Sequence, residues 1–143
     1  MNTEAIVFYL DDDQEDLLFF KDAASLVAKE VEVKTRMNSD ELLHDLHNPP
    51  PVPSAIFLDI NMPKRNGLDV LTSIRNRSEF DHIPVIIFTT SNSPDVIDKS
   101  KQLGANLFIT KPTNFSDLKK AIKYTLDLDW KTLVQDQFLY GVN

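Results

Sequence analysis

The sequence predicts a doubly wound α/β fold, in which helices cover both faces of a parallel sheet. Two observations lead to this prediction. Five short apolar runs have the length and composition of buried strands, and segments with helical spacing of apolar residues separate them. Strand and helix alternate at intervals of roughly 25 residues, which is typical of repeated βα units. In such sheets the functional site forms at the carboxyl ends of the strands.

Five strands follow from the apolar runs. They are expected at residues 5–10, 31–35, 55–59, 84–89 and 106–110. Runs that are apolar throughout, without polar alternation, indicate strands buried on both faces. Carboxylates are therefore expected only at the ends of these strands, where water or a cation can reach them.

The helices are predicted from their end signals and their apolar spacing. Asn38, Ser93 and Asn114 have the side chains of N-cap residues and stand before the second, fourth and fifth helices. Helical spacing predicts the first helix after strand 5–10 and the third helix after Gly67. Gly104 is expected to end the fourth helix.

Length, composition and charge narrow the class of protein. The 143 residues suit one domain, and the net charge of −7 argues against nonspecific binding to nucleic acid. The chain has no cysteine and no apolar run as long as a membrane span, and its first residues do not resemble a signal peptide. We therefore expect a cytoplasmic protein that binds neither nucleic acid nor a membrane.

Polar residues that can carry chemistry follow four of the predicted strands. Asp11 and Asp12 follow the first strand, Asp59 ends the third, Thr89 ends the fourth, and Lys111 follows the fifth. These side chains should meet at one edge of the sheet, where three carboxylates repel one another unless a cation lies between them. Hard oxygen ligands favour Mg²⁺, with Mn²⁺ as the alternative. A cation, an ammonium group and a hydroxyl around a carboxylate suit a phosphoryl group, with the carboxylate as its nucleophile.

Four stretches extend this interpretation to a family: VFYLDDDQEDL, AIFLDINMPKRNGLDVL, PVIIFTTS and GANLFITKP. Together they resemble the receiver domain of two-component response regulators, over about residues 4–128. The resemblance implies a flavodoxin-like fold with a five-stranded parallel sheet in the order 2-1-3-4-5 and helices on both faces. The acidic start, residues 11–16, and the long C-terminal extension also resemble single-domain receivers paired with phytochrome-type kinases.

The resemblance also implies a role for each residue of the site. Asp59 matches the aspartate that is phosphorylated to 4-aspartylphosphate. The metal site would consist of Asp12, Asp59, the backbone carbonyl of Asn61, and Asp11 acting through water. Lys111 matches the lysine that pairs with the phosphoryl group.

Two further positions match the conformational switch of the family. Thr89 corresponds to the hydroxyl that is drawn to the phosphoryl group, and Phe108 to the aromatic side chain that follows it. Asn61 and Ser91 would flank the path of the water that hydrolyses the acyl phosphate. The Lys111–Pro112 peptide bond is typically cis in the family.

The function implied is two-component signal transduction. A histidine kinase or phosphotransfer protein would donate the phosphoryl group, and the receiver would change its affinity for an unknown downstream protein. The chain would not be an enzyme, apart from promoting its own phosphorylation and dephosphorylation.

Residues 1–129 are expected to form this receiver, and residues 130–143 a C-terminal extension. The extension carries apolar side chains such as Trp130, Leu133, Val134 and Phe138. It either continues the fifth helix and packs on its own domain, or provides a surface for a homodimer or a partner.

Three other interpretations compete with this one. A receiver-like adaptor that works without phosphorylation would keep the same fold. A phosphatase of the haloacid dehalogenase type would need Thr or Val where Glu15 stands. A flavodoxin-like cofactor binder would need a loop rich in Ser, Thr or Gly, which the run of acids at residues 11–13 opposes.

Overall fold

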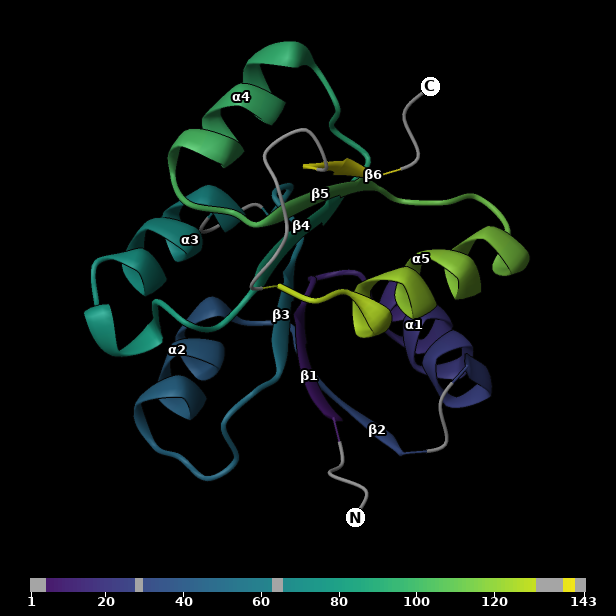
Figure 1. Ribbon diagram of the computed structural model, residues 1–143, viewed down its shortest axis with the longest axis horizontal. Coiled ribbons are helices and arrows are strands. Elements are labelled where there is room, and N and C mark those ends of the chain that lie inside the picture. The colour runs from purple at the N-terminus through teal and green to yellow at the C-terminus, as the bar shows by residue number, and fades with distance from the viewer. Residues whose placement is uncertain (1–4, 28–29, 63–65, 131–137, 141–143) are drawn as a thin grey trace.

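A computed structural model describes residues 5–27, 30–62, 66–130 and 138–140 of the chain. It contains one parallel sheet with the strand order β2-β1-β3-β4-β5-β6 (Figure 1). The strands are β1 (Ala5–Leu10), β2 (Val31–Arg36), β3 (Ala55–Leu58), β4 (Val85–Thr89), β5 (Leu107–Thr110) and β6 (Leu139–Tyr140). The first five agree with the predicted strands to within one residue at each end, and their order confirms the flavodoxin-like arrangement.

Helices connect successive strands of the sheet, as the alternating pattern predicted. They are α1 (Gln14–Val27), α2 (Ser39–His47), α3 (Gly67–Arg75), α4 (Pro94–Gln102) and α5 (Phe115–Asp127), with a short 3₁₀ helix η1 (Ser78–Phe80) after α3. The N-caps are confirmed: Asn38, Ser93 and Asn114 each accept backbone N–H groups with their side chains. Gly104 has φ 103° just beyond α4, a conformation that glycine adopts without strain.

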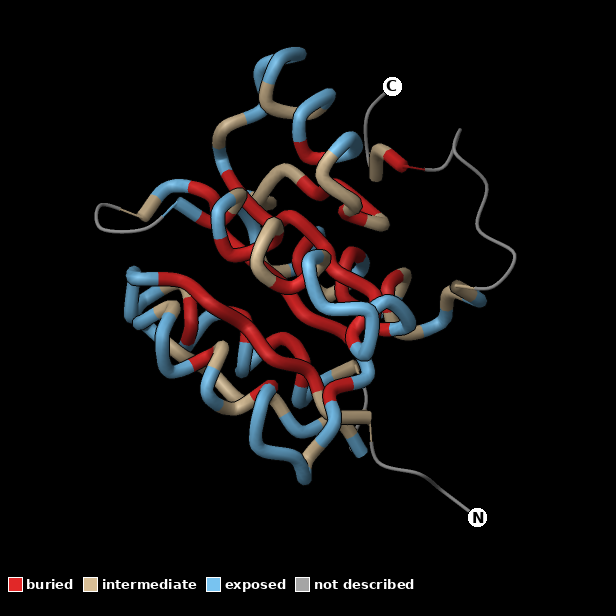
Figure 2. Tube along the Cα trace, turned by 90° about the vertical axis from the view of Figure 1, so that its left-hand side faces the viewer, coloured by how far each residue is buried: buried red, intermediate tan, exposed pale blue. Residues whose placement is uncertain are grey.

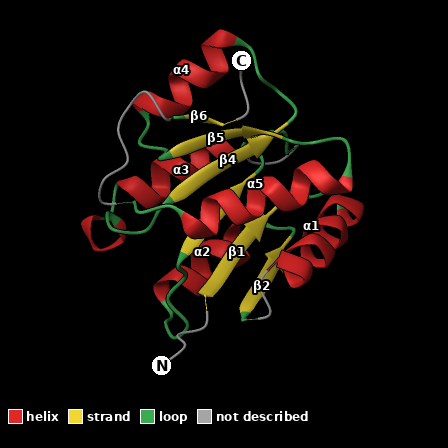
Figure 3. Cartoon of the chain, turned by 45° about the vertical axis from the view of Figure 1, so that its right-hand side comes forward, coloured by secondary structure: helices red, strands yellow, loops and turns green. Residues whose placement is uncertain are grey.

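The sheet separates two apolar layers. On one face α1 and α5 lie side by side, and residues such as Phe20 and Ile122 pack there against Phe57 (Figure 3). On the other face, residues of α2 and α3 such as Leu42 and Ile74 pack against the sheet. The strands β1, β3, β4 and β5 are mostly buried between these layers, and Figure 2 shows buried chain through the centre of the molecule. Side chains at the carboxyl ends of the strands are therefore held by rigid, well-packed elements.

A sixth strand adds to the five that the resemblance implied. Phe138 is buried and precedes β6, which pairs in parallel with β5. The backbone N–H of Phe108 donates to the carbonyl of Phe138 at 2.8 Å, and the two rings lie 6.4 Å apart. Helix α5 ends at Asp127, before the extension begins. Leu133 and Val134 lie outside the described residues.

Among the described residues, no helix combines the length and the apolar character that a bilayer crossing would need.

Candidate functional site

The three acids predicted to form a cluster do lie together at the carboxyl ends of β1 and β3. Leu10 and Leu58 are paired across these two parallel strands, so the residues that follow them leave the sheet side by side. One carboxylate oxygen each from Asp11, Asp12 and Asp59 lies within 4.8 Å of the others. Asp11 and Asp59 are 0% and 4% exposed, whereas Asp12 is exposed to solvent. The cluster is therefore buried at Asp11 and Asp59 and open to solvent at Asp12.

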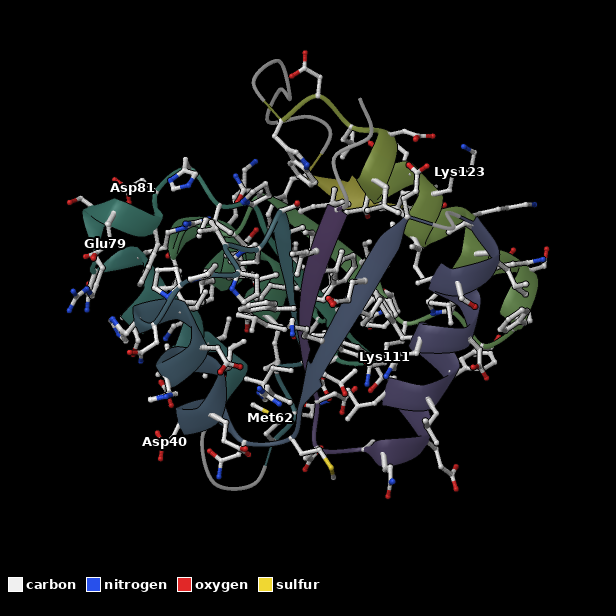
Figure 4. The ribbon with its side chains drawn as sticks, turned by 90° about the horizontal axis from the view of Figure 1, so that it is seen from below. Asp40, Met62, Glu79, Asp81, Lys111 and Lys123 are labelled. Carbon is white, nitrogen blue, oxygen red and sulfur yellow. The ribbon has the colours of Figure 1, made fainter. Side chains whose placement is uncertain are left out.

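Lys111 approaches the same acids from the end of β5. Its Nζ donates to Asp11 Oδ2 at 2.7 Å, to Asp16 Oδ2 at 2.7 Å and to Asp59 Oδ2 at 3.3 Å. Figure 4 shows Lys111 beside α1, at the same end of the molecule as Met62. The two shorter bonds hold the ammonium group toward α1, within reach of Asp59.

Burial and ion pairing oppose each other in this group. Burial lowers the pKa of Lys111, but the hydrogen bonds that it donates to Asp11 and Asp16 and the negative charges of Asp11 and Asp59 together outweigh that effect, so the pKa stands above its ordinary value. Burial raises the pKa of Asp11, while the hydrogen bonds from Lys111 and Tyr9 oppose that rise. Lys111 is therefore charged at neutral pH and offsets part of the negative charge of the cluster.

Thr89 is the last residue of β4, and Asn61 follows Asp59 by two residues in the loop after β3. Thr89 is fully buried, and its Oγ1 accepts the backbone N–H of Ser91 at 3.3 Å. The backbone N–H of Asn61 donates to Asp59 Oδ1 at 3.2 Å. The Asn61 side chain and the Ser91 hydroxyl bond to each other, with Nδ2 to Oγ at 2.7 Å and Oγ to Oδ1 at 2.9 Å. These two side chains therefore form one hydrogen-bonded pair next to Asp59.

Gly67 allows the chain to pass closely behind Asp59. A Cβ atom at this position would lie 2.1 Å from the carbonyl oxygen of Asp59 and 3.0 Å from Cα of Ile60. Since these are backbone atoms, a side chain could be accommodated only by moving the loop. The N-terminus of α3 is thus fitted against the backbone of Asp59.

Phe108 is buried, with its ring facing Phe138 across the β5–β6 pair.

The expectation of a cis bond at Lys111–Pro112 was wrong. The cis bonds among the described residues are Pro49–Pro50 and Pro50–Pro51. The trans form is the intrinsically favoured isomer of an X–Pro bond.

Two residues of the site were not predicted. Asp16 comes from the first turn of α1 and Tyr9 from within β1, and each contacts a predicted residue: Asp16 binds Lys111, and Tyr9 donates to Asp11 at 2.5 Å. A signal for Tyr9 was available, because residues i and i+2 of a strand point to the same face. Asp16 could have been noticed as an acid on the turn of α1 that follows Asp12.

The oxygen donors fit a small divalent cation. Two carboxylates from adjacent residues and a third from the neighbouring strand converge, and no imidazole belongs to the described cluster. Mg²⁺ takes a few such oxygens and keeps several water molecules, which the exposed side at Asp12 admits. The net negative charge, only partly offset by Lys111, also favours a cation.

Comparison with known proteins agrees with this geometry. Residues 7–123 match the model of the response regulator receiver domain, so the chain belongs to this family. Receiver domains are signalling domains rather than enzymes in the usual sense, and they act with histidine kinases or phosphotransfer proteins.

Individual relatives point to the same family. The response regulator Rcp1 of Synechocystis sp. is 38% identical over 73 residues, covering 51% of this chain and 50% of Rcp1. This chain thus spans about half the length of the curated relatives it matches.

Solved structures are similar over more of the chain. The phosphorylated cyanobacterial phytochrome response regulator RcpA superimposes with a TM-score of 0.79 at 28% identity, covering 93% of this chain and 98% of RcpA. The Mn²⁺-bound form of Rcp1 gives a TM-score of 0.76 at 24% identity, covering 91% and 97% of the two chains. The second likeness concerns the fold alone.

Proposed function

We propose that this chain is a response regulator whose Asp59 accepts a phosphoryl group from a histidine kinase or a phosphotransfer protein. The observation that carries the proposal is the position of the Asp59 carboxylate. One of its oxygens lies within 4.8 Å of a carboxylate oxygen of each of two further acids, and its Oδ2 lies 3.3 Å from an ammonium group. This is the charge arrangement that stabilises a phosphoryl group on an oxygen nucleophile.

Asp12, Asp59 and the backbone carbonyl of Asn61 would hold Mg²⁺ or Mn²⁺ directly, and Asp11 would act through water. Rcp1, whose matched part is 38% identical to this chain, has a known Mn²⁺-bound form, which supports the assignment. When bound, the ion neutralises charge on the phosphoryl oxygens.

The residues of the chain then have separate tasks in the transfer. A carboxylate oxygen of Asp59 attacks phosphorus, and the bond from phosphorus to the donor's imidazole nitrogen breaks. Lys111 turns from Asp11 and Asp16 toward the new phosphoryl oxygens, and the Thr89 hydroxyl donates to another of them. Later, water attacks phosphorus and releases phosphate, with the Asn61–Ser91 pair controlling its access. The chain promotes both steps on itself and turns over no other substrate.

The output follows from the connection between Thr89 and β5. Lys111 N–H donates to the Thr89 carbonyl at 2.9 Å, so β4 and β5 are joined at the site. A shift of Thr89 toward the phosphoryl group opens space for Phe108, and this changes the surface formed by α4 and β5. That surface binds the downstream protein.

The proposal extends to the organisation and location of the protein. Residues 1–129 form the receiver and residues 130–143 its extension, and the chain works in the cytoplasm. The acidic start of α1 and the likeness to RcpA and Rcp1 support a kinase of the phytochrome type.

Incubation with acetyl phosphate and Mg²⁺, followed by peptide mass spectrometry, tests the proposal. We expect an increase of one phosphoryl group on the peptide that contains Asp59, and none in Asp59→Asn. An unlabelled wild-type protein, or equal labelling of the variant, would contradict the assignment. Labelling that does not require Mg²⁺ would contradict the metal site.

A further inference from the structure

A buried tyrosine that the proposed mechanism does not use lies directly beneath the acidic cluster. Tyr9 is 0% exposed, and its ring is surrounded by three phenylalanines. The ring centroids lie 4.6 Å from Phe20, 6.4 Å from Phe57 and 5.7 Å from Phe88. A phenylalanine would fill the same apolar space, so the hydroxyl serves something other than packing.

That hydroxyl donates to Asp11 Oδ2 at 2.5 Å. The same oxygen accepts from Lys111 Nζ at 2.7 Å, and the other oxygen, Oδ1, accepts the backbone N–H of Asp13 at 2.9 Å. Asp11 is fully buried, so these protein donors stand in for water around its carboxylate. Tyr9 and the Asp13 N–H hold the two oxygens from different sides and thereby fix the orientation of the group.

Lys111 is the donor that has to change partners. Under the proposed function, its ammonium group must turn from Asp11 and Asp16 toward the phosphoryl group on Asp59. Without a second donor, Asp11 Oδ2 would then be a buried and unpaired acceptor, which is strongly unfavourable. The hydroxyl of Tyr9 keeps that oxygen hydrogen-bonded throughout.

We propose that Tyr9 is a positioning residue of the metal and phosphoacceptor site. Its hydroxyl fixes the Asp11 carboxylate for cation binding and releases Lys111 to follow the phosphoryl group. This inference rests on the proposed function and adds a residue from inside the core to the site. Outer partners that orient metal-binding carboxylates have a large effect on metal affinity.

The test removes one oxygen atom. Mn²⁺ binding to the full chain is measured by calorimetry for wild type, Tyr9→Phe and the control Tyr124→Phe, whose ring contacts Tyr140 in another part of the molecule. We expect about tenfold weaker binding in Tyr9→Phe and unchanged binding in Tyr124→Phe. Equal affinity in all three proteins would overturn the inference, as would a wild type that does not bind Mn²⁺.

A spectroscopic signal separates positioning from a general loss of stability. The chain has three tyrosines, so the double variant Tyr124→Phe/Tyr140→Phe keeps Tyr9 alone. Addition of Mn²⁺ should change its near-ultraviolet tyrosine absorption, because the hydroxyl is bonded to a carboxylate of the site. No change in this variant would overturn the inference even if Tyr9→Phe failed to fold.

The outcome is independent of the labelling experiment on Asp59. A wild type that binds Mn²⁺ through a site dependent on Tyr9, yet is not labelled by acetyl phosphate, would contradict the proposed function and the release of Lys111, but not the role of Tyr9 in cation binding. A labelled wild type whose Mn²⁺ affinity is unaffected by Tyr9→Phe would contradict the role of Tyr9 only.

Discussion

Lys111 balances the charge of the site, because its ammonium group contacts three carboxylates. The carboxylates around Lys111 raise its pKa in the folded protein, and burial is the main cause that raises the pKa of Tyr9. Both groups therefore hold their protons more tightly when folded than when unfolded. The stability this provides is complete below the unfolded pKa values of about 10 and is lost as the pH rises above them.

Urea denaturation between pH 8 and pH 11 measures this dependence. We expect the free energy of unfolding to be nearly constant up to about pH 9.5 and to fall above about pH 10. In Lys111→Met the decline should be shallower by up to about 1.4 kcal/mol per pH unit, the effect of one proton. Equal slopes in both proteins would show that the pKa of Lys111 is the same in the folded and unfolded states.

Asp16 competes with Asp59 for the same ammonium group. Its bond to Lys111 is 2.7 Å long against 3.3 Å for Asp59, and its side chain is partly exposed. Asp16→Asn should free Lys111 and reduce the repulsion of an anionic donor. Since a partly exposed ion pair contributes about 1 kcal/mol or less, the labelling rate with acetyl phosphate at saturating Mg²⁺ should rise by less than about fivefold.

The matched control for this variant is Glu15→Gln. It removes the same charge from the neighbouring residue, while the described ion pairs of Lys111 remain. A rate increase of equal size in both variants would mean that overall charge, rather than release of Lys111, determines the rate.

Helix α3 is held at both ends by features that a helical pattern does not reveal. At its C-terminus, the guanidinium of Arg75 donates to the carbonyls of Gly104, Phe80 and Ile83 and to Asn106 Oδ1. Burial lowers the pKa of Arg75. One side chain thus joins α3 to η1, to the residues before β4 and to the loop between α4 and β5.

Arg75→Lys should destabilise the fold by about 2 kcal/mol, because a single ammonium group cannot reproduce the planar set of donors. Thermal or urea denaturation measures the change. Arg77→Lys is the control, since Arg77 is exposed and pairs with Glu79 alone among its described ion pairs. Similar stability of the two variants would contradict the structural role of Arg75, and labelling of Asp59 should persist in both.

At the other end of α3, Gly67→Ala should affect stability and labelling together. The added methyl group would meet the carbonyl oxygen of Asp59, so the loop has to move, at a cost of about 3 kcal/mol. Labelling of Asp59 should be slowed, because its carboxylate moves with the backbone. Gln102→Ala, on the exposed side of α4, should change neither property. A Gly67→Ala protein with normal stability and labelling would refute the close approach of Gly67 to the backbone of Asp59.

Elements with strong local signals were predictable from the sequence. Strand 55–59 was expected one residue too long: β3 ends at Leu58, although the backbone N–H of Asp59 still donates to the carbonyl of Leu10 at 3.0 Å. The caps at Asn38 and Ser93 depend on neighbouring residues only, and they were predicted correctly. Contacts such as Lys111 to Asp16 join residues 95 positions apart, so only the folded arrangement reveals them.

For the molecule as a whole, the strand β6 was the least predictable element. Two residues carry too little pattern to indicate a strand, and β6 exists because the edge of β5 offers it backbone partners. The Phe138 side chain adds an apolar contact to this pairing, because its ring lies next to Phe108. Lys101 Nζ also lies 5.6 Å from the centre of the Phe138 ring. The described part of the extension is therefore packed on the receiver.

Phe138→Ala should lower the free energy of unfolding by about 3 kcal/mol, since it removes a buried ring next to the core. Chemical denaturation provides the measurement. Leu26→Ala, at a position that is 67% exposed, is the control and should stay within about 0.5 kcal/mol of wild type. Equal stability of the two variants would show that the extension is not part of the folded receiver.

Sedimentation of a chain that ends at residue 129 decides between the two roles considered for the extension. If β6 covers the edge of its own sheet, the shortened chain exposes β5 and should associate more than wild type. If the extension instead forms a dimer surface, the shortened chain should become more monomeric.

The two apolar layers of the sheet have different relations to the site. Tyr9 belongs to the layer covered by α1 and α5, whereas Phe108 belongs to the opposite layer with α3 and residues of α4. Under the proposed function, capture of the phosphoryl group and its readout would involve opposite faces of the sheet. Residues in the layer of Tyr9 could then be substituted to suit a new phosphoryl donor. The layer of Phe108, and with it the binding of the downstream protein, would stay unchanged.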